Sequence, residues 1–141
     1  MEQEEHFLGK VAQKAIIHRD GKVFLTRDPR TPDTWELPGG RLNVGERPKE
    51  GLIRELSEEL GVECEIGEVL YLEQFRQGNE SGQLSLVIVY KATIKPGSEI
   101  RVDSREVMEY GWFSKEDLVG MRLFPEYVEA LEIFFISCCP L

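Results

Sequence analysis

Five segments of the chain combine short apolar runs with alternating polar residues, a pattern that is typical of β-strands. They span residues 10–19, 22–27, 62–75, 84–94 and 107–113. Asp20-Gly21, between the first two segments, is a strong signal for a hairpin turn. Gly67 allows an early turn in the third segment, and residues 77–82 are expected to turn before the fourth. The pattern therefore predicts a sheet that contains at least one hairpin.

Two further segments have the spacing of amphipathic helices. In the first, Pro48 suits the opening turn of a helix and Gly61 suits the position just after its end. We therefore expect a helix from Pro48 to about Leu60. In the second, apolar residues recur at helical spacing over residues 124–136.

A shorter helix is expected at residues 115–119, because Ser114 and Asp117 have the spacing of a capping box. The chain has 141 residues and shows no internal repeat or linker, so we expect residues 1–141 to form a single domain. The expected strands surround one central helix and one C-terminal helix. This order of elements places the chain in the α/β class (α+β mixed).

The composition is that of a globular protein, since 41% of the residues are hydrophobic. The first residues are mostly acidic, and no apolar run of signal-peptide length follows them. No stretch approaches the roughly 20 apolar residues needed to cross a bilayer. We therefore expect a cytoplasmic protein with no membrane partner. The three cysteines, Cys64, Cys138 and Cys139, have the spacing of neither a disulfide framework nor a zinc site.

The balance of charge narrows the partners. The chain has 26 acidic and 17 basic residues, for a net charge of −9. Such a surface repels nucleic-acid phosphates, so bulk DNA or RNA is not an expected partner. A protein of this charge that handles a phosphorylated small molecule needs a cation between itself and its substrate.

The segment from Gly40 to Val62 carries the chemistry, with the sequence GRLNVGERPKEGLIRELSEELGV. It resembles the Nudix box, G-x5-E-x7-R-E-U-x-E-E-x-G-U, in which U is an aliphatic residue. Every specified position matches: Gly40, Glu46, Arg54, Glu55, Leu56, Glu58, Glu59, Gly61 and Val62. The flanking segments 35–39 (WELPG) and 109–113 (EYGWF) are also similar to the family. The resemblance therefore covers most of the chain.

Helical geometry gives an independent reason to expect a functional face. At about 100° per residue, Glu55, Glu58 and Glu59 fall within an arc of roughly 100°, beside the apolar arc that faces the core. Carboxylates three and four residues apart destabilise a helix. A divalent cation reverses this effect, because Mg²⁺ prefers carboxylate oxygens, water and substrate phosphates as ligands. The alternative is a solvated acidic face, which is common in glutamate-rich chains.

The resemblance implies an α/β/α sandwich with a mixed sheet, in which the catalytic helix follows a Gly-Gly loop. It implies that Glu55, Glu58 and Glu59 bind Mg²⁺ or Mn²⁺, with the Gly39 carbonyl as a further ligand. The expected activity is hydrolysis of a diphosphate linkage by water.

Other residues of the box are expected to support this site. Gly40 would allow a close approach of the backbone to the metal. Glu46 and Arg54 are expected to hold the loop to the helix through charge-assisted hydrogen bonds. Alternatively, Arg54 pairs with Glu58 at i,i+4.

The base that accepts the proton of water differs between branches of the family. In some it is the first glutamate of R-E-x-x-E-E, here Glu55. In others it is a glutamate on a later loop, for which Glu106 is our first candidate and Glu109 the second. Three basic residues near the box are candidate phosphate contacts, unless they are simply solvated: Arg27, Arg30 and Arg41.

The expected substrate is a small nucleotide-like molecule. The chain lacks the downstream signatures of the ADP-ribose, NADH and coenzyme A branches, which leaves (deoxy)nucleoside triphosphates or a nucleoside diphosphate joined to another group. Four aromatic residues either stack on a base or belong to the core: Tyr71, Phe75, Phe124 and Tyr127. Two other functions are a Nudix domain that senses a nucleotide without cleaving it and an isoprenoid diphosphate isomerase. Both a monomer and a homodimer are compatible with the sequence.

Gly51 adds a detail that the box does not specify. A glycine in the middle of a helix costs about 1 kcal/mol relative to alanine. Gly51 lies one turn before Glu55, on the acidic face. Its missing side chain either leaves space for metal, water or a neighbouring loop, or allows tight packing against a strand.

Overall fold

The computed structural model describes residues 4–76 and 82–137. The described residues form seven strands, two α-helices and one 3₁₀ helix. In chain order these are β1 (Lys10–Arg19), β2 (Lys22–Arg27), β3 (Trp35–Glu36), β4 (Gly39–Arg41), α1 (Pro48–Leu60), β5 (Cys64–Arg76), β6 (Leu84–Ile94), β7 (Glu109–Phe113), η1 (Glu116–Leu118) and α2 (Pro125–Ser137). None of the described helices is long and apolar enough to cross a membrane.

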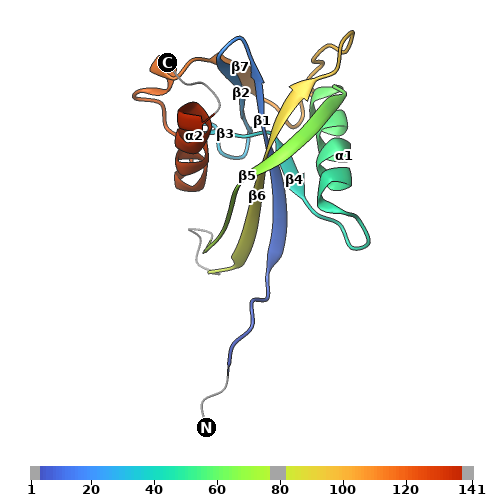
Figure 1. Cartoon of the computed structure of the whole chain (residues 1–141), viewed down its shortest axis with the longest axis vertical. Helices are drawn as coiled ribbons and strands as arrows, with labels where there is room; N and C mark the ends of the chain where they lie inside the picture. The colour runs from blue at the N-terminus through green and yellow to red at the C-terminus, as the bar shows by residue number, and fades with distance from the viewer. Residues whose placement is uncertain (1–3, 77–81, 138–141) are drawn as a thin grey trace.

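The strands form one mixed sheet in which β1 is the central element. The strand order is β3-β2-β1-β6-β5, with β4 also paired to β1 and β7 to β2. β1 runs parallel to β6 over most of its length, whereas its last two residues pair with β2 in an antiparallel hairpin. β1 therefore connects the two halves of the sheet, as Figure 1 shows.

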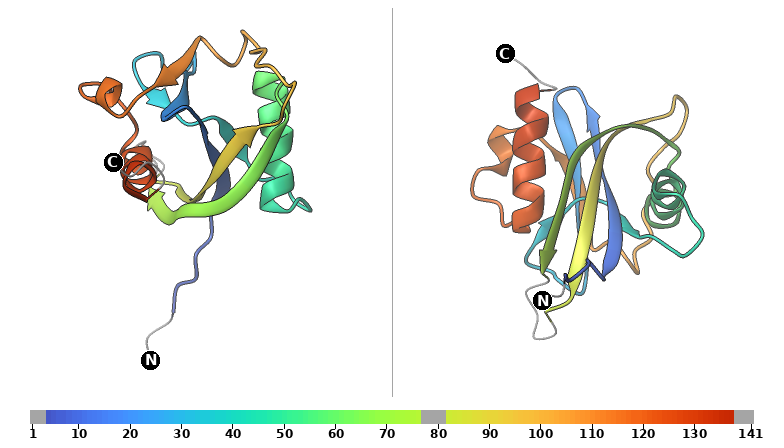
Figure 2. Two further views of the ribbon diagram at one scale, coloured as in Figure 1. Left: turned by 45° about the horizontal axis from the view of Figure 1, so that its top comes forward. Right: turned by 60° about the horizontal axis from the view of Figure 1, so that its bottom comes forward.

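The two helices cover opposite faces of this sheet (Figures 1 and 2). Residues 13–17 of β1 are buried on both faces. Ala15 and Ile17 belong to the core beneath α1, together with Leu52 and Leu56 of that helix. Ile16 belongs to the second core, beneath α2. The predicted α/β/α arrangement is confirmed, and it explains why Ala15, Ile16 and Ile17 form an uninterrupted apolar run in β1.

The bounds of α1 are those expected from its end signals. The helix begins at Pro48 and ends at Leu60. Gly61 has a left-handed φ of 58°, and its N–H donates to the Ser57 carbonyl at 2.9 Å. This closes the helix as expected for a C-terminal glycine.

The predicted capping box is present at the start of η1. The Ser114 N–H donates to Asp117 Oδ2 at 2.9 Å, and the Asp117 N–H donates to Ser114 Oγ at 3.2 Å. The helix itself is a single 3₁₀ turn, shorter than the expected residues 115–119.

The early turn that Gly67 allowed in this segment is absent. β5 continues through this position, and its pairing with β6 shifts register between Ile66 and Val69. A Cβ at Gly67 would lie 3.1 Å from the carbonyl oxygen of Lys91 on β6. The glycine therefore permits a bulge and a close approach of the neighbouring strand rather than a turn.

Two other predictions concern residues outside the described ranges. These are the turn predicted at residues 77–82, of which only Gly82 is described, and the assignment of the cysteines Cys138 and Cys139. Cys64 is buried and is not in a disulfide. Its burial raises the pKa of the thiol to about 11, so it is an inert core residue.

Candidate active site

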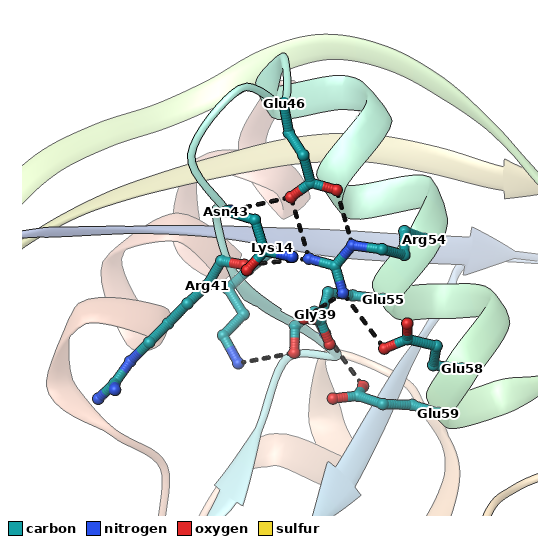
Figure 3. Close-up of polar contacts among 9 residues, drawn as sticks. All are labelled: Lys14, Gly39, Arg41, Asn43, Glu46, Arg54, Glu55, Glu58 and Glu59. Carbon is teal, nitrogen blue, oxygen red and sulfur yellow. Dashed lines mark hydrogen bonds and ion pairs between the residues drawn. The ribbon is translucent and has the colours of Figure 1, made fainter.

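Pairing between β1 and β4 brings the Gly-Gly segment against the middle of the sheet. Gly39 pairs with Lys14 and Gly40 with Gln13. Gly39 has a φ of 137°, and a Cβ there would overlap the Gln13 carbonyl oxygen and lie 2.9 Å from Lys14 Cα. Only glycine allows this approach. The Gly39 N–H is thereby directed at Glu59 of α1, donating to its Oε2 at 3.3 Å (Figure 3).

Gly40 provides the space for the carboxyl group of Glu55. A Cβ added at Gly40 would overlap the Glu55 carboxyl carbon and crowd both of its oxygens. Glu55 is largely buried, with 17% of its side chain exposed, and its Oε1 lies 3.0 Å from Arg54 Nη1. The two glycines thus place backbone directly against two glutamates of the helix.

Arg54 joins the loop before α1 to the acidic face of the helix. It binds Glu46 through two contacts, Nε to Oε2 at 2.7 Å and Nη2 to Oε1 at 3.0 Å. Its Nη1 also donates to Glu55 at 3.0 Å and to Glu58 at 3.2 Å. The Arg54 guanidinium lowers the pKa of Glu46. Both arrangements considered from the sequence, the loop contact and the i,i+4 pair, are therefore present together.

The carboxylates are neighbours but are not yet arranged as a coordination shell. Within residues 4–76 and 82–137, no group of three or more His, Cys, Asp or Glu side chains is positioned to hold a metal ion. Arg54 holds Glu55 and Glu58 through the same nitrogen, and 56% of the Glu58 side chain is exposed. Figure 3 shows Glu58 and Glu59 extending from α1 on the side of the helix where Arg54 and Gly39 lie.

Glu59 is a partly buried member of the group. Burial raises the pKa of its carboxyl to about 7, and the nearby charges of Glu55 and Glu106 act in the same direction. The Lys14 ammonium and the Gly39 N–H oppose this rise in pKa. Glu59 therefore lies close to both a positive charge, Lys14, and two further carboxylates, Glu55 and Glu106, and the loss of hydration outweighs them in setting its pKa.

A loop beyond β6 brings Glu106 into this neighbourhood. The last turn of α1 has unpaired carbonyl groups, which accept hydrogen bonds from this loop. The Arg101 N–H donates to the Leu60 carbonyl at 2.6 Å, and the Asp103 N–H donates to the Glu59 carbonyl at 2.7 Å. Glu106 follows within three residues of Asp103 and is exposed. The later-loop candidate therefore lies close to the box.

The remaining candidates differ in position. Arg27 forms an ion pair with Glu109 and donates a hydrogen bond to the Pro32 carbonyl at 2.6 Å. A candidate phosphate contact and the second candidate base, Glu109, are therefore paired with each other. Arg30 is paired with Asp28. Arg41 is exposed, and its side chain extends away from the glutamates in Figure 3.

Of the four aromatic candidates, two belong to the core beneath α2. Tyr71 and Tyr127 are buried there, and the Tyr71 hydroxyl donates to Glu129 at 2.9 Å. Phe75 and Phe124 are partly buried against the same core. Base stacking by any of them stays a prediction.

Sequence reasoning missed two buried polar residues and one half-buried carboxylate beside the Gly-Gly segment. Gln13 and Lys14 lie in the centre of β1, with exposures of 0% and 9%. Glu36 lies on β3, and burial raises its pKa. A signal was available for the first two, because they interrupt an otherwise apolar strand that is buried on both faces.

A comparison with protein families shows which family the chain belongs to. The NUDIX domain matches residues 10–134, from the start of β1 into α2. The chain belongs to the Nudix family. The resemblance drawn from the box is thus confirmed over nearly the whole chain.

Similar proteins are Nudix enzymes of different specificity. The CTP pyrophosphohydrolase of Escherichia coli (strain K12) is 33% identical over 123 residues, which are 85% of this chain and 87% of that protein. A human diphosphoinositol polyphosphate phosphohydrolase is 30% identical over 128 residues, 86% of this chain and 67% of that protein. The crystal structure of a MutT Nudix hydrolase from Burkholderia pseudomallei superposes with a TM-score of 0.77 at 30% identity, covering 89% of this chain and 98% of the other. The protein is therefore a Nudix hydrolase of the pyrophosphohydrolase type, which acts on nucleotide-like substrates.

Two shallow hollows on the surface lie apart from the Nudix box. One, of about 330 Å³, is lined by residues such as Arg19, Lys95 and Ser98. The other, of about 210 Å³, is lined by Tyr110 and Trp112 among others. No residue of the Nudix box lines either hollow.

Gly51 packs against both β1 and the loop before α1. A Cβ at this position would lie 2.7 Å from Gln13 Nε2, 3.0 Å from Glu46 Oε1 and 3.2 Å from Leu42 Cδ1. The missing side chain therefore makes room for a strand and a neighbouring loop, so both of the packing explanations apply.

Gly51→Ala is expected to destabilise the protein by about 1–2 kcal/mol. The gain of about 1 kcal/mol in helix propensity is outweighed by overpacking of a buried site. Urea unfolding measures this change, and Gly97→Ala is a control for the backbone cost alone, because Gly97 has a φ of 84° with nothing within 4 Å of an added Cβ. A stabilised Gly51→Ala variant with unchanged turnover would show that the space is not needed.

The raised pKa of Glu59 predicts a pH dependence of stability in the metal-free Nudix domain. The folded carboxyl titrates at about 7, whereas the ordinary value is 4.5. Between these values the folded state binds more protons than the unfolded state, so the free energy of unfolding falls as pH rises. We expect Glu59 to contribute a loss on the order of 1–3 kcal/mol between pH 5 and pH 7.5. Urea unfolding with a chelator present measures it, as the difference in slope between wild type and Glu59→Gln. Parallel slopes for the two proteins would contradict the assignment, and Glu50→Gln serves as the exposed control on the same helix.

Proposed function

We propose that the chain acts as a single domain that hydrolyses a (deoxy)nucleoside triphosphate to the nucleoside monophosphate and pyrophosphate, with CTP as the first substrate to test. Water attacks phosphorus, the bond between the α-phosphorus and the bridging oxygen breaks, and pyrophosphate leaves. The observation that carries the proposal is the hydrogen bond from the Gly39 N–H to the partly buried Glu59, which puts the acidic residues of the Nudix box beside the sheet. The similarity to CTP pyrophosphohydrolase over 87% of that protein's length supports the nucleotide and the bond.

The charges around the site favour a nucleotide over a polyphosphorylated inositol. A ligand with many phosphate groups requires many free cationic partners. Three arginines around the site are already paired, namely Arg27 with Glu109, Arg30 with Asp28, and Arg54 with Glu46. The side chain of a fourth, Arg41, extends away from the glutamates. The net charge of −9 adds long-range repulsion that grows with the charge of the ligand.

The residues of the site fit Mg²⁺ or Mn²⁺. Glu55, Glu58, Glu59 and the Gly39 carbonyl would hold the ion, since all of them offer hard oxygen ligands. The Gly39 carbonyl oxygen already faces a cationic group, the ammonium of Lys14 at 3.5 Å, so its direction suits a positive ligand. When bound, the ion neutralises substrate phosphates and lowers the pKa of a coordinated water.

We assign the base to Glu106, with Glu55 as the alternative. Among the described residues, Glu106 takes part in no ion pair, whereas Glu55 is held by Arg54. A free carboxylate can turn toward the attacking water and accept its proton at a carboxylate oxygen. Arg54 acts as a positioning residue, which keeps the loop and the acidic helix face in register.

The base assignment is tested by pH–rate profiles of Glu106→Gln and Glu55→Gln. Removing the base should lower kcat by about 100-fold or more and abolish the acidic limb of the profile. Removing a metal ligand should instead leave the limb and raise the metal concentration needed for half-maximal rate. Retention of the limb in Glu106→Gln and its loss in Glu55→Gln would assign the base to Glu55.

The proposed function is tested with a substrate panel. The protein is incubated with Mg²⁺ and CTP, dCTP, ATP, GTP, ADP-ribose or a diphosphoinositol phosphate, and products are separated by anion-exchange chromatography. We expect CMP or dCMP with an equal amount of pyrophosphate. A Glu58→Gln, Glu59→Gln double variant, purified in parallel, excludes a contaminating phosphatase. Release of orthophosphate in place of pyrophosphate, or turnover of the inositol compound alone, would contradict the proposal.

A further inference from the structure

Lys14 is a buried cation that the Nudix box does not include. It lies in the centre of β1 and is only 9% exposed. Its Nζ donates to the Gly39 carbonyl oxygen at 3.5 Å (Figure 3). It also lies 5.7 Å from the centre of the Tyr127 ring. Burying an ammonium group is costly unless partners compensate for the lost hydration. The residues around Lys14 must therefore supply negative charge or hydrogen-bond acceptors.

The compensating charges include a carboxylate of the proposed metal site. Glu36 and Glu59 both lie close enough for their charges to act on Lys14. The effect is reciprocal, since Lys14 acts on both carboxyl groups. Gly39 lies between Lys14 and Glu59 in Figure 3, with its carbonyl toward the lysine and its N–H toward the glutamate. The ammonium thus contacts an oxygen that the proposed function gives to the metal.

In this arrangement, the charge of Lys14 repels a cation bound at the proposed metal site. A positive charge next to two proposed ligands disfavours a divalent cation at the same place. The contact at 3.5 Å is long for an N–H···O hydrogen bond, and the lysine side chain has four flexible carbons. An anionic phosphate that arrives with the metal offers the ammonium a stronger partner than a neutral carbonyl.

We propose that Lys14 couples metal binding to substrate binding: its ammonium rests against the Gly39 carbonyl in the free protein, where it opposes the divalent ion, and binds a substrate phosphate when nucleotide and metal enter together. The inference rests on the proposed function, because it takes Gly39 and Glu59 as metal ligands. It adds a contact residue outside the box, which makes metal and nucleotide bind cooperatively.

The test separates the two affinities. Mn²⁺ binding is measured by electron paramagnetic resonance without nucleotide, and α,β-methylene-CTP binding is measured by calorimetry at saturating Mn²⁺. Lys14→Met should bind Mn²⁺ alone about fivefold more tightly and the analogue about fivefold or more weakly, the lower range of coupling between sites. The two shifts have opposite signs, whereas a merely structural role would weaken both.

Matched variants keep the result interpretable. Lys10→Met removes an exposed lysine from the same strand and should leave both affinities unchanged. Lys14→Arg keeps the positive charge and should keep the Mn²⁺ affinity near that of wild type. Lys14→Gln removes the charge but keeps a donor for the Gly39 carbonyl, so it should reproduce both shifts even if Lys14→Met folds poorly.

Several outcomes would overturn the inference. Unchanged or weakened Mn²⁺ binding in both neutral variants would do so, as would unchanged binding of the analogue. If wild type hydrolyses CTP but the neutral variants do not bind Mn²⁺ more tightly, the proposed function stands and the coupling fails. If they bind Mn²⁺ more tightly but no nucleotide is hydrolysed, the opposition to metal stands and the proposed substrate fails.

Discussion

Glu59→Gln is expected to lower kcat by at least about 100-fold, because removing even an indirect partner of a metal ligand commonly costs 10–100-fold. Glu59 is a partly buried carboxylate of the group and accepts a hydrogen bond from the Gly39 N–H. Glutamine keeps the size and the hydrogen-bonding oxygen but loses the charge that attracts a divalent ion. The half-saturating concentration of Mg²⁺ should therefore rise together with the loss of rate. Steady-state rates across a Mg²⁺ titration measure both quantities.

Glu58→Gln should give a loss of the same kind, although Glu58 contributes little to the folded structure. More than half of its side chain is exposed, and its contact is the pair with Arg54. Unfolding temperatures should therefore stay close to that of wild type. Glu50→Gln, on an exposed position of the same helix, is the matched control and should retain full rate. Unaffected rates in both Glu58→Gln and Glu59→Gln would remove the metal assignment.

Alanine at the two adjacent glycines should separate a folding role from a catalytic one. At Gly39, a Cβ meets rigid backbone of β1, and the φ of 137° is one that alanine rarely adopts. Gly39→Ala should lower the free energy of unfolding by about 3 kcal/mol or more. At Gly40, the Cβ meets the end of a flexible side chain, the carboxyl of Glu55. Gly40→Ala should therefore fold nearly as well as wild type but lose about 100-fold in kcat, because the carboxylate must move from its place.

Urea unfolding and kcat, measured on both variants, test this separation. Gly120→Ala is the control for the conformational cost alone, since Gly120 has a φ of 84° with nothing within 4 Å of an added Cβ. It should cost about 1 kcal/mol and leave kcat unchanged. Full activity in Gly40→Ala would mean that the observed place of the Glu55 carboxylate is not used in the reaction.

Much of the catalytic helix was predictable because its signals are local. Pro48 and Gly61 set the two ends through backbone conformation, and the structure has the same bounds. The spacing of the acidic residues puts them on one face by the period of the helix alone. The same holds for the Ser114–Asp117 capping box, whose two bonds join residues three positions apart.

The failures at strand level have a common physical cause. Gly67 allowed a turn, but pairing with β6 carries β5 through it as a bulge. The short strands β3 and β4 were not predicted, because two or three residues give no periodicity. In each case a partner strand decides the structure, and no local pattern identifies that partner.

What the sequence determined by itself is the chemistry-bearing motif, the helix that carries it and the class of fold, because each depends on spacing within a few turns of chain. Only the tertiary structure decided which residues surround that motif. Lys14 reaches Gly39 through strand pairing across 25 positions, and the loop of Glu106 is held by carbonyl groups at the end of α1. Such contacts depend on hydrogen bonds and buried charges that must find partners when the sheet closes, and no local pattern specifies those partners.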